Sequence, residues 1–316
     1  MRVPAFKTIE EKRNAYQYRQ VFQFQDLLEV FNEWRSSNFY FRGQADGSWK
    51  IYSSLQREWI TKELNERFSF YANYCESFLK FTGNRYRPFI NRYCKVITDV
   101  SIFSTVQHYG APTPFIDWTS NPLVALYFAS LGNDLCIGDE TSSFVSIYGI
   151  SVGEGPSTPN NDLTRFSDLV ANHKNQMDEV RGEWGNILGS DYSEIIRYSV
   201  WKALVLWMEE AEEEFMQIAN PRSDLQNGAF IYNSEPEKSL DEIFTGKTLE
   251  SFGNTEEATN GAEVLFLPKI HCLDIHKSVL PQIRKYLQEC NYDKRSLGLC
   301  GDNWGQNLYQ DFLAHI

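Results

Sequence analysis

An arginine stands inside an aromatic segment whose other residues predict a buried strand. Arg42 follows Asn-Phe-Tyr-Phe and precedes Gly43 and Gln44. Burying an unpaired arginine costs on the order of several kcal/mol, so its guanidinium should meet a carboxylate, backbone carbonyls or an anionic ligand such as a phosphate. Gly43 would let a ligand or another backbone approach closely. A structural Arg–Asp pair and an anion-binding site both fit these residues.

A second group of polar and aromatic residues surrounds a predicted turn between residues 104 and 122. A helix should end at Gly110, and a strand follows within "PFIDWT". The residues that this turn brings together are Gln107, His108, Asp117, Trp118 and Thr119. Asp117 is the obvious internal partner for Arg42. We favour a site for the whole group, although His108 alone is explained more simply as a hydrogen-bonded core histidine.

The same stretch continues into a helix that should open at Ser120 or Asn121, with Pro122 at its first position. The first backbone N–H groups of a helix lack partners within it, and the helix dipole favours negative charge at that end. An anionic ligand is therefore compatible with this position.

A third polar stretch, "NPRSDLQNGAFIYN", places four residues immediately before or inside a predicted strand. They are Arg222, Asp224, Gln226 and Gly228. A hairpin turn explains this stretch more simply than a site does.

These residues depend on an α+β arrangement. Helical spacing predicts helices at about 26–36, in a block from 54 to 109 broken near Gly83 and Pro88, and at 194–218, 277–290 and 304–316. Alternating and β-branched residues predict strands at 38–43, 114–119, 143–151, 228–233 and 263–275. No repeat or linker divides the chain, so we read residues 1–316 as one domain with a polar, loop-rich insertion at about 153–190.

Composition limits the function. The chain of 316 residues is 42% hydrophobic, which is ample for a core, and its net charge of −12 argues against a general nucleic-acid binder. No apolar run has the length of a signal peptide or a membrane span, so we expect no membrane association and a cytoplasmic location. The six cysteines stand singly, as is typical of reduced thiols. His271, Cys272 and His276 are explained by a strand leading into a helix, so no metal site is expected.

Several stretches together resemble the bacterial FRG-domain family. The segments "YFRGQ", "QHYGAPT", "DWTSNPLVALYFA" and "QNGAF" look like its successive motifs, and the family takes its name from a triplet such as Phe41-Arg42-Gly43. The ending "LGLCGDNWGQNLYQDF" is similar to the family's terminal region, so the resemblance spans about residues 24–315. Pro114 stands where the family usually has arginine. The family implies a bacterial setting, often near defence or mobile elements.

A further resemblance points to a reaction. Arg42 and "DWTSNPLVALYFA" are similar to the first two elements of arginine–serine–glutamate type mono-ADP-ribosyltransferases. This implies a small mixed or antiparallel split sheet flanked by helices, NAD as substrate, and cleavage of its nicotinamide–ribose bond. Arg42 would hold the pyrophosphate, Asp117 and Thr119 would fix the nicotinamide ribose, and an aromatic would stack on the nicotinamide. The implied cofactor-binding residues are Arg42, Gly43, Gln44, His108, Trp118 and Gln226.

The catalytic glutamate of that reaction has two placements in this chain. If "QNGAFIY" is the third element, Gln226 and Gly228 stand where the glutamates belong; if "GAEVLFLP" is, Glu263 is the catalytic acid. Glu58 or Glu194 could also supply a carboxylate. A glutamate here would stabilise an oxocarbenium-like transition state.

The sequence therefore predicts an NAD-dependent ADP-ribosyltransferase-like enzyme, a toxin or anti-phage effector acting on a protein or nucleic-acid acceptor. The alternative is a non-catalytic nucleotide- or partner-binding module. A nuclease is a distant third, because Asp117, Asp224 and Glu263 are widely separated in the sequence.

Overall fold

The computed structural model describes residues 2–35, 39–68, 71–91, 99–132, 140–151, 205–209, 225–226, 228–233, 235–244, 270–299, 301 and 303–316. Within these ranges, the strands are β1 (Gln17–Val21), β2 (Phe39–Gln44), β3 (Phe115–Thr119), β4 (Phe144–Ser151), β5 (Val205–Glu209), β6 (Gly228–Asn233) and β7 (Ile270–His276). The helices are α1 (Ile9–Ala15), α2 (Phe24–Arg35), α3 (Ser54–Thr61), α4 (Tyr71–Arg85), α5 (Arg87–Ile90), α6 (Asp99–His108), α7 (Pro122–Ser130), α11 (Leu240–Phe244), α13 (Leu280–Glu289) and α14 (Trp304–Leu313). The α+β class is confirmed.

The described strands form one mixed sheet in the order β1-β7-β4-β2-β3-β6-β5. Among the described strands, only β1 and β7 are parallel neighbours, and the other neighbouring strands are antiparallel. β2 and β3 share a single register pair, Phe41 opposite Thr119, whereas β2 and β4 pair over six residues. The sheet is therefore split at its centre into the halves β1-β7-β4-β2 and β3-β6-β5.

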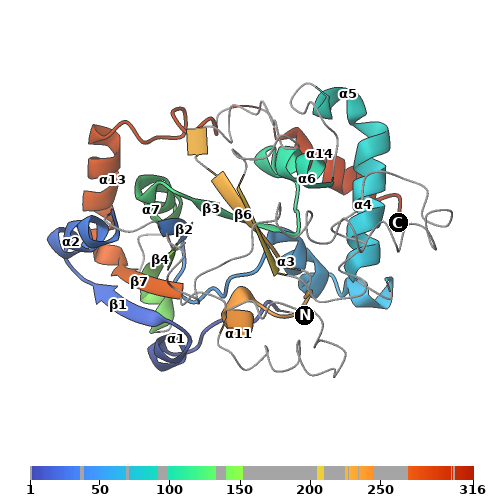
Figure 1. Cartoon of the computed structure of the whole chain (residues 1–316). Coiled ribbons are helices and arrows are strands. Elements are labelled where there is room, and N and C mark those ends of the chain that lie inside the picture. Colours follow the sequence, from blue (N-terminus) through green and yellow to red (C-terminus); the bar gives the residue numbers. More distant parts are fainter. Residues whose placement is uncertain are drawn as a thin grey trace, which may run out of the picture.

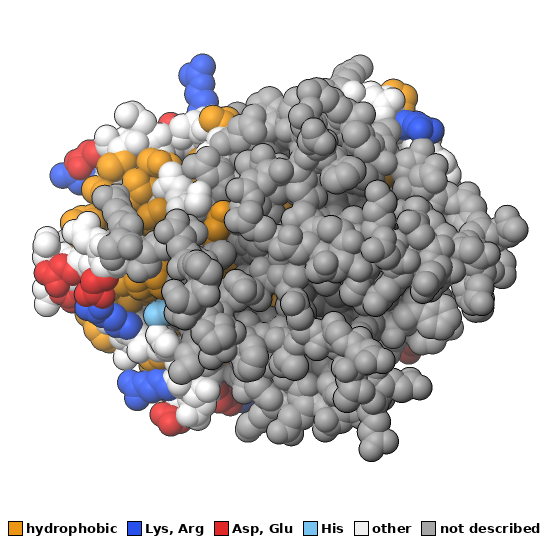
Figure 2. All heavy atoms as spheres, viewed as in Figure 1, with side chains coloured by type: hydrophobic (Ala, Val, Ile, Leu, Met, Phe, Trp, Pro, Cys, Tyr) orange, Lys and Arg blue, Asp and Glu red, His pale blue; other side chains and the backbone are white. Residues whose placement is uncertain are grey.

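Each half of the sheet has its own helices (Figure 1). α2, α7 and α13 lie against the β2–β4–β7 half, with a core that includes Leu27, Phe41 and Ile283. The helical block α3 to α6, with α14, lies against the β3–β6 half. Where α2 and α13 lie, Figure 2 shows hydrophobic side chains interspersed with acidic and basic ones, so that described surface has no single charge sign.

The helical block follows its sequence pattern with one shift. α3 begins with a capping box in which Ser53 and Gln56 satisfy each other's backbone N–H groups. Gly83 lies inside α4, and the break comes at Tyr86, after which Pro88 stands in the first turn of α5. A proline there costs no hydrogen bond, since the first helical N–H groups have no partner.

One expectation about the elements is wrong, and some elements of the structure were not expected. Residues 205–209, expected within a helix at 194–218, form strand β5, because Val-Leu-Trp-Met-Glu pairs along the edge of β6; the rest of that expected helix lies outside the described residues. α1 and β1 were not expected at all. β1 reads Gln-Tyr-Arg-Gln-Val and exposes or half-exposes its first four residues, so it offers little apolar alternation.

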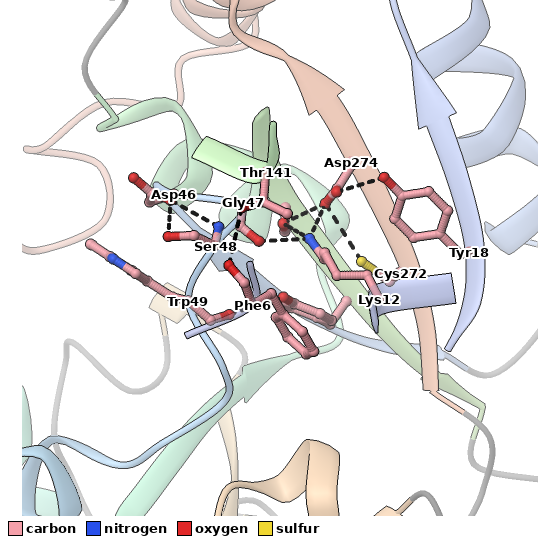
Figure 3. A network of polar contacts seen from close by, with 12 residues as sticks. Phe6, Lys12, Tyr18, Asp46, Gly47, Ser48, Trp49, Thr141, Cys272 and Asp274 are labelled. Carbon is pink, nitrogen blue, oxygen red and sulfur yellow. Dashed lines mark hydrogen bonds and ion pairs between the residues drawn. The ribbon is translucent and has the colours of Figure 1, made fainter. Parts of the chain in front are cut away.

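A buried ion pair fastens this N-terminal segment to the sheet (Figure 3). The fully buried Nζ of Lys12 donates to a carboxylate oxygen of the fully buried Asp274, to Oγ of Ser146 at 2.9 Å and to the Gly47 carbonyl at 2.8 Å. The Tyr18 hydroxyl donates to the other oxygen of Asp274 at 2.8 Å. All three protons of the ammonium are thereby satisfied, and the loop after β2 is tied to β4 and β7.

Candidate functional site

Arg42 lies where the sheet splits. Continuing the register of β2 and β3 past Phe41 and Thr119 would pair Gly43 with Asp117, but the two strands pair no further. Nη1 of Arg42 instead donates to the backbone carbonyl of Asp117 at 2.8 Å. The arginine therefore supplies a donor to a carbonyl that the adjacent strand does not reach, which is a structural reason for a charge in an aromatic strand.

The neighbours of Arg42 in the triplet have separate packing roles. Phe41 is buried and stacks against Trp34 with ring centroids 5.6 Å apart. A methyl group at Gly43 would lie 1.8 Å from the carbonyl oxygen of Ala125, because the backbone of α7 crosses β2 at this residue. Of the two alternatives for Gly43, the approach of another backbone is therefore present in the structure.

A second arginine, Arg57, lies in α3 and is marked by no sequence motif. Nη1 of Arg57 donates to the backbone carbonyl of Tyr52 at 2.9 Å. Desolvation of the guanidinium, and then the like charge of Arg42, lower the pKa of Arg57 to about 10, while Asp117 and Glu58 oppose this shift; the residue as a whole is exposed. Burial also lowers the pKa of Arg42, and Asp117 and then Tyr148 oppose that effect. The two guanidiniums are thus electrostatic neighbours.

Asp117 is held by a chain of side chains from the turn before it. Nε2 of Gln107, in the last turn of α6, donates to a carboxylate oxygen of Asp117, and the Thr113 hydroxyl donates to Oε1 of the same amide. The backbone N–H of Thr113 in turn donates to Oγ of Ser54 at 2.9 Å. Asp117 itself remains exposed in β3. The carboxylate is therefore accessible and has a fixed orientation.

Thr119 and Gln226, two of the candidate residues from separate sequence stretches, are in contact in the folded chain. The Thr119 hydroxyl donates to the backbone carbonyl of Gln226 at 2.6 Å and accepts from the Asn121 N–H at 3.1 Å. Nε2 of Gln226 donates to the carbonyl of Leu297 at 3.2 Å. The Thr119 hydroxyl is thus engaged by backbone both as donor and as acceptor.

The helix after this strand begins as expected. Oδ1 of Asn121 accepts the Leu123 N–H at 2.9 Å, which makes Asn121 the N-cap of α7, and Pro122 is its first residue. Gly110 has a φ of +91°, the left-handed conformation that suits glycine at the end of α6. The turn that gathers the second group of residues is therefore confirmed.

The remaining candidate residues lie around this centre in different environments. Trp118 is 2% exposed and packs in the core on the opposite face of β3 from Asp117, so stacking on a ligand would require that core to open. Gln44 is buried, and none of the described residues hydrogen-bonds its Oε1. His108 packs edge-on against Phe230 at 6.2 Å.

The acids proposed for catalysis are placed only in part. Glu263, Glu194, Asp224 and also Arg222 lie outside the described residues. Glu58 follows Arg57 in α3 and forms an ion pair with Lys62 at 2.7 Å. Within the described residues, no three histidine, cysteine or acidic side chains are grouped so as to hold a metal ion.

The family comparison covers this centre. The family model for the FRG domain matches residues 37–134. This segment is an FRG domain. It contains the Arg42, Arg57, Gln107, Asp117 and Thr119 positions, whereas Gln226 and the terminal region, which also resembled the family, fall outside the match.

No curated protein and no solved structure matches the chain. Across the described part of the chain, no helix is long and apolar enough to span a membrane. The argument for a site in this segment therefore depends on its geometry, in which Arg42 and the oriented carboxylate of Asp117 lie at the split of the sheet.

Proposed function

We propose that this protein is an NAD-dependent ADP-ribosyltransferase-like enzyme whose substrate binds at the split between β2 and β3. The observation that carries the proposal is the position of Arg42. Its guanidinium donates to the backbone carbonyl of Asp117, whose side-chain carboxylate is exposed, so one cation and one carboxylate belong to adjacent residues at the split of the sheet. This is the pairing that the resemblance to ADP-ribosyltransferases assigns to the phosphates and the ribose of NAD.

In this reaction the bond between nicotinamide nitrogen and C1′ of the ribose breaks, and its electron pair leaves with nicotinamide. Positive charge develops on the ribose, and a nucleophilic oxygen or nitrogen of the acceptor then forms the new bond to C1′ and loses its proton. Asp117, which Gln107 orients, would stabilise the developing charge. Glu263 is the second acid proposed for this step, and Arg42 would hold the phosphates.

The biological setting follows from the family and the charge. We propose a role as a toxin or anti-phage effector, acting on a protein or nucleic-acid acceptor in the cytoplasm. The FRG domain and the charge of −12 support a specific acceptor rather than general binding to nucleic acid.

Binding without chemistry is the second candidate. It is favoured by the contacts of Thr119, whose hydroxyl is already engaged by the carbonyl of Gln226 and the N–H of Asn121. In that case the same centre recognises a phosphate-bearing nucleotide or partner without cleaving it.

One experiment separates the two. Purified protein is incubated with NAD, nicotinamide release is measured by chromatography, and binding is measured by the shift in melting temperature. Release by the wild type that Asp117→Asn abolishes, with NAD still bound, supports the enzyme. A melting shift without release supports the binding module. If the protein releases no nicotinamide and NAD causes no shift in its melting temperature, both candidate functions are overturned.

A further inference from the structure

Basic and aromatic residues alternate in the stretch that joins α4 to α5. Residues 85–89 read Arg-Tyr-Arg-Pro-Phe. Around them, residues 77–98 contain five lysines and arginines and no aspartate or glutamate, whereas the whole chain has a net charge of −12. A local positive charge in an acidic protein is the electrostatic footprint expected of a site for a polyanionic partner.

Trp304, the first residue of α14, gathers the aromatic rings of this stretch. Its ring centroid lies 5.9 Å from that of Tyr86, 5.8 Å from that of Phe89 and 5.0 Å from that of Tyr109, which follows α6. The ring planes of Tyr86 and Trp304 differ by 9°, and those of Tyr109 and Trp304 by 25°, so these three rings are stacked. The ends of α4 and α6, the short α5 and the start of α14 therefore meet at one corner of the helical block (Figure 1).

These rings are open to solvent. Phe89 is 43% exposed, and Tyr86, Tyr109 and Trp304 are half-buried. The aromatic rings in the core of the same helical block are buried, and rings that only fastened α14 to this block would be expected to be covered in the same way. At the upper right of Figure 2, where α5 lies in Figure 1, hydrophobic and basic side chains lie next to each other.

The arginines beside these rings are exposed as well. The guanidinium carbon of Arg85 lies 5.7 Å from the ring centroid of Phe81, and 52% of the side chain is exposed. Its nearest described carboxylate oxygen, on Asp311, is 3.8 Å away, and a surface ion pair of this kind contributes little, so a phosphate can replace it at small cost. Arg87 is exposed at the start of α5. Guanidiniums for phosphates and rings for bases are the two contacts by which proteins bind single strands.

We propose that these residues form a binding surface for single-stranded nucleic acid, named here the aromatic corner: Arg85, Tyr86, Arg87, Phe89, Tyr109 and Trp304. Bases stack on the exposed ring of Phe89, and phosphates contact the two arginines. Unpaired bases are required, because the faces of the bases in a duplex are covered by their neighbours. The inference deepens the proposed function, on which it rests for the role of the ligand, by naming single-stranded nucleic acid as the class of acceptor.

The aromatic corner is tied to the turn that carries the candidate site. The Gly305 N–H donates to the carbonyl of Tyr109 at 3.0 Å, and a methyl group at Gly305 would lie 2.8 Å from the same carbonyl oxygen. Gln107, two residues before Tyr109, orients Asp117. The proposed acceptor surface and the proposed catalytic acid are thus connected through one turn of the backbone.

The test measures fluorescence anisotropy of labelled oligothymidylate and oligouridylate of about 15 nucleotides, with the full chain and without NAD. The wild type should bind a single strand at least about fivefold more tightly than a duplex of equal length, although the duplex carries more charge. Binding of either single strand supports the inference, and the comparison of the two identifies the sugar.

Phe89→Ala should weaken this binding by at least about fivefold, the effect of one lost stacking contact, and Phe89→Trp should retain it. Phe22→Ala is the matched control and should bind as the wild type does. Phe22 is a phenylalanine with 56% exposure that contacts Phe144 and His276, on the other half of the sheet.

Arg87→Gln should lower the slope of log affinity against log salt by about 0.7, the value for one phosphate contact on a single strand. Arg19→Gln removes the same charge elsewhere and should leave the slope unchanged, since Arg19 forms an exposed ion pair with Glu33 at 2.9 Å.

Crosslinking covers the event that a variant fails to fold. Ultraviolet light attaches a bromouracil-containing oligonucleotide to the wild-type chain, and mass spectrometry should place the attachment within residues 85–91 or 303–306. Attachment only at other residues would overturn the inference.

Three binding results would also overturn it. These are a duplex that binds as tightly as the single strand, affinity that Phe89→Ala leaves within about twofold of the wild type, and displacement of the oligonucleotide by a polyglutamate peptide of equal charge. The last result would assign the surface to acidic peptides. Oligonucleotide binding without nicotinamide release would overturn the proposed reaction alone, and release without oligonucleotide binding would overturn only the aromatic corner.

Discussion

Arg42 donates to the backbone carbonyl of Asp117, at 2.8 Å, while the carboxylate of Asp117 receives its hydrogen bond from Gln107. The arginine and the aspartate are thus neighbours, but among the ion pairs of the described residues there is none between their side chains. This relationship leaves the charge of the arginine available to a ligand. It also fixes the carboxylate independently of the arginine, through a residue of a helix.

Gln107 should matter more for activity than for folding. In the proposed reaction, Gln107→Leu removes the donor that orients Asp117, so we expect nicotinamide release to fall by up to about a hundredfold, the loss that a misplaced catalytic group can cause. Release is measured at saturating NAD, alongside the melting temperature. Gln310→Leu, on the exposed side of α14, is the control and should leave release unchanged. Normal release by Gln107→Leu would contradict the role.

Gly43 should tolerate no side chain. The added methyl group of Gly43→Ala would lie 1.8 Å from the Ala125 carbonyl, so α7 must shift, at a cost of about 1–3 kcal/mol in unfolding free energy. Gly83→Ala is the matched control. Its methyl group would meet only Ile102, at 3.7 Å, within α4, and alanine is the better helix former by roughly 0.5–1 kcal/mol. The urea midpoint should therefore decrease in Gly43→Ala and increase in Gly83→Ala. Equal changes in the two midpoints would show that α7 shifts at little cost.

The pair of Lys12 and Asp274 should be costly to break from one side. Lys12→Met leaves the fully buried carboxylate of Asp274 without its cation, and we expect a loss of about 3–5 kcal/mol. Arg19→Met, which breaks the exposed pair with Glu33, should cost less than about 1 kcal/mol. Guanidinium unfolding measures both. A loss of similar size in the two variants would mean that the buried pair adds little.

Stability should fall as pH rises through the titration of Asp241. Burial raises the pKa of this carboxyl from 3.8 to about 7, and its Oδ2 accepts the Ile51 N–H at 2.7 Å. Between these two pH values the folded chain holds a proton that the unfolded chain has released, so unfolding free energy decreases with rising pH. Each unit of difference in pKa corresponds to about 1.4 kcal/mol, which gives a loss on the order of 4 kcal/mol at most.

Asp241→Asn isolates this effect, because the amide can still accept the Ile51 N–H without titrating. Urea midpoints at pH 4.5, 6 and 8 should show the variant gaining on the wild type as pH increases. Glu237→Gln removes an exposed negative charge from the same segment and should show no such gain. A difference in stability between the wild type and Asp241→Asn that stays constant across pH would refute the assignment.

The sequence by itself determined the elements whose residues carry strong local signals. Asn121 and Pro122 open a helix because of capping chemistry, and Gly110 closes one because it adopts a positive φ. Arg42 and Asp117 were paired because a buried charge needs a partner. The sequence did not predict β1, and it predicted a helix where β5 lies. Both segments have polar or acidic neighbours in the sequence and adopt the strand conformation by pairing with another strand, β1 with β7 and β5 with β6.

Only the tertiary structure decided what Arg42 contacts. The sequence left a carboxylate, backbone carbonyls and a phosphate open, and the split after Phe41 and Thr119 presented a backbone carbonyl. Arg57 could not be found from the sequence, since no motif includes it and the charge of Arg42 acts on it only in the folded chain. Local chemistry chooses helices, turns and charges, whereas long-range pairing determines which charges meet.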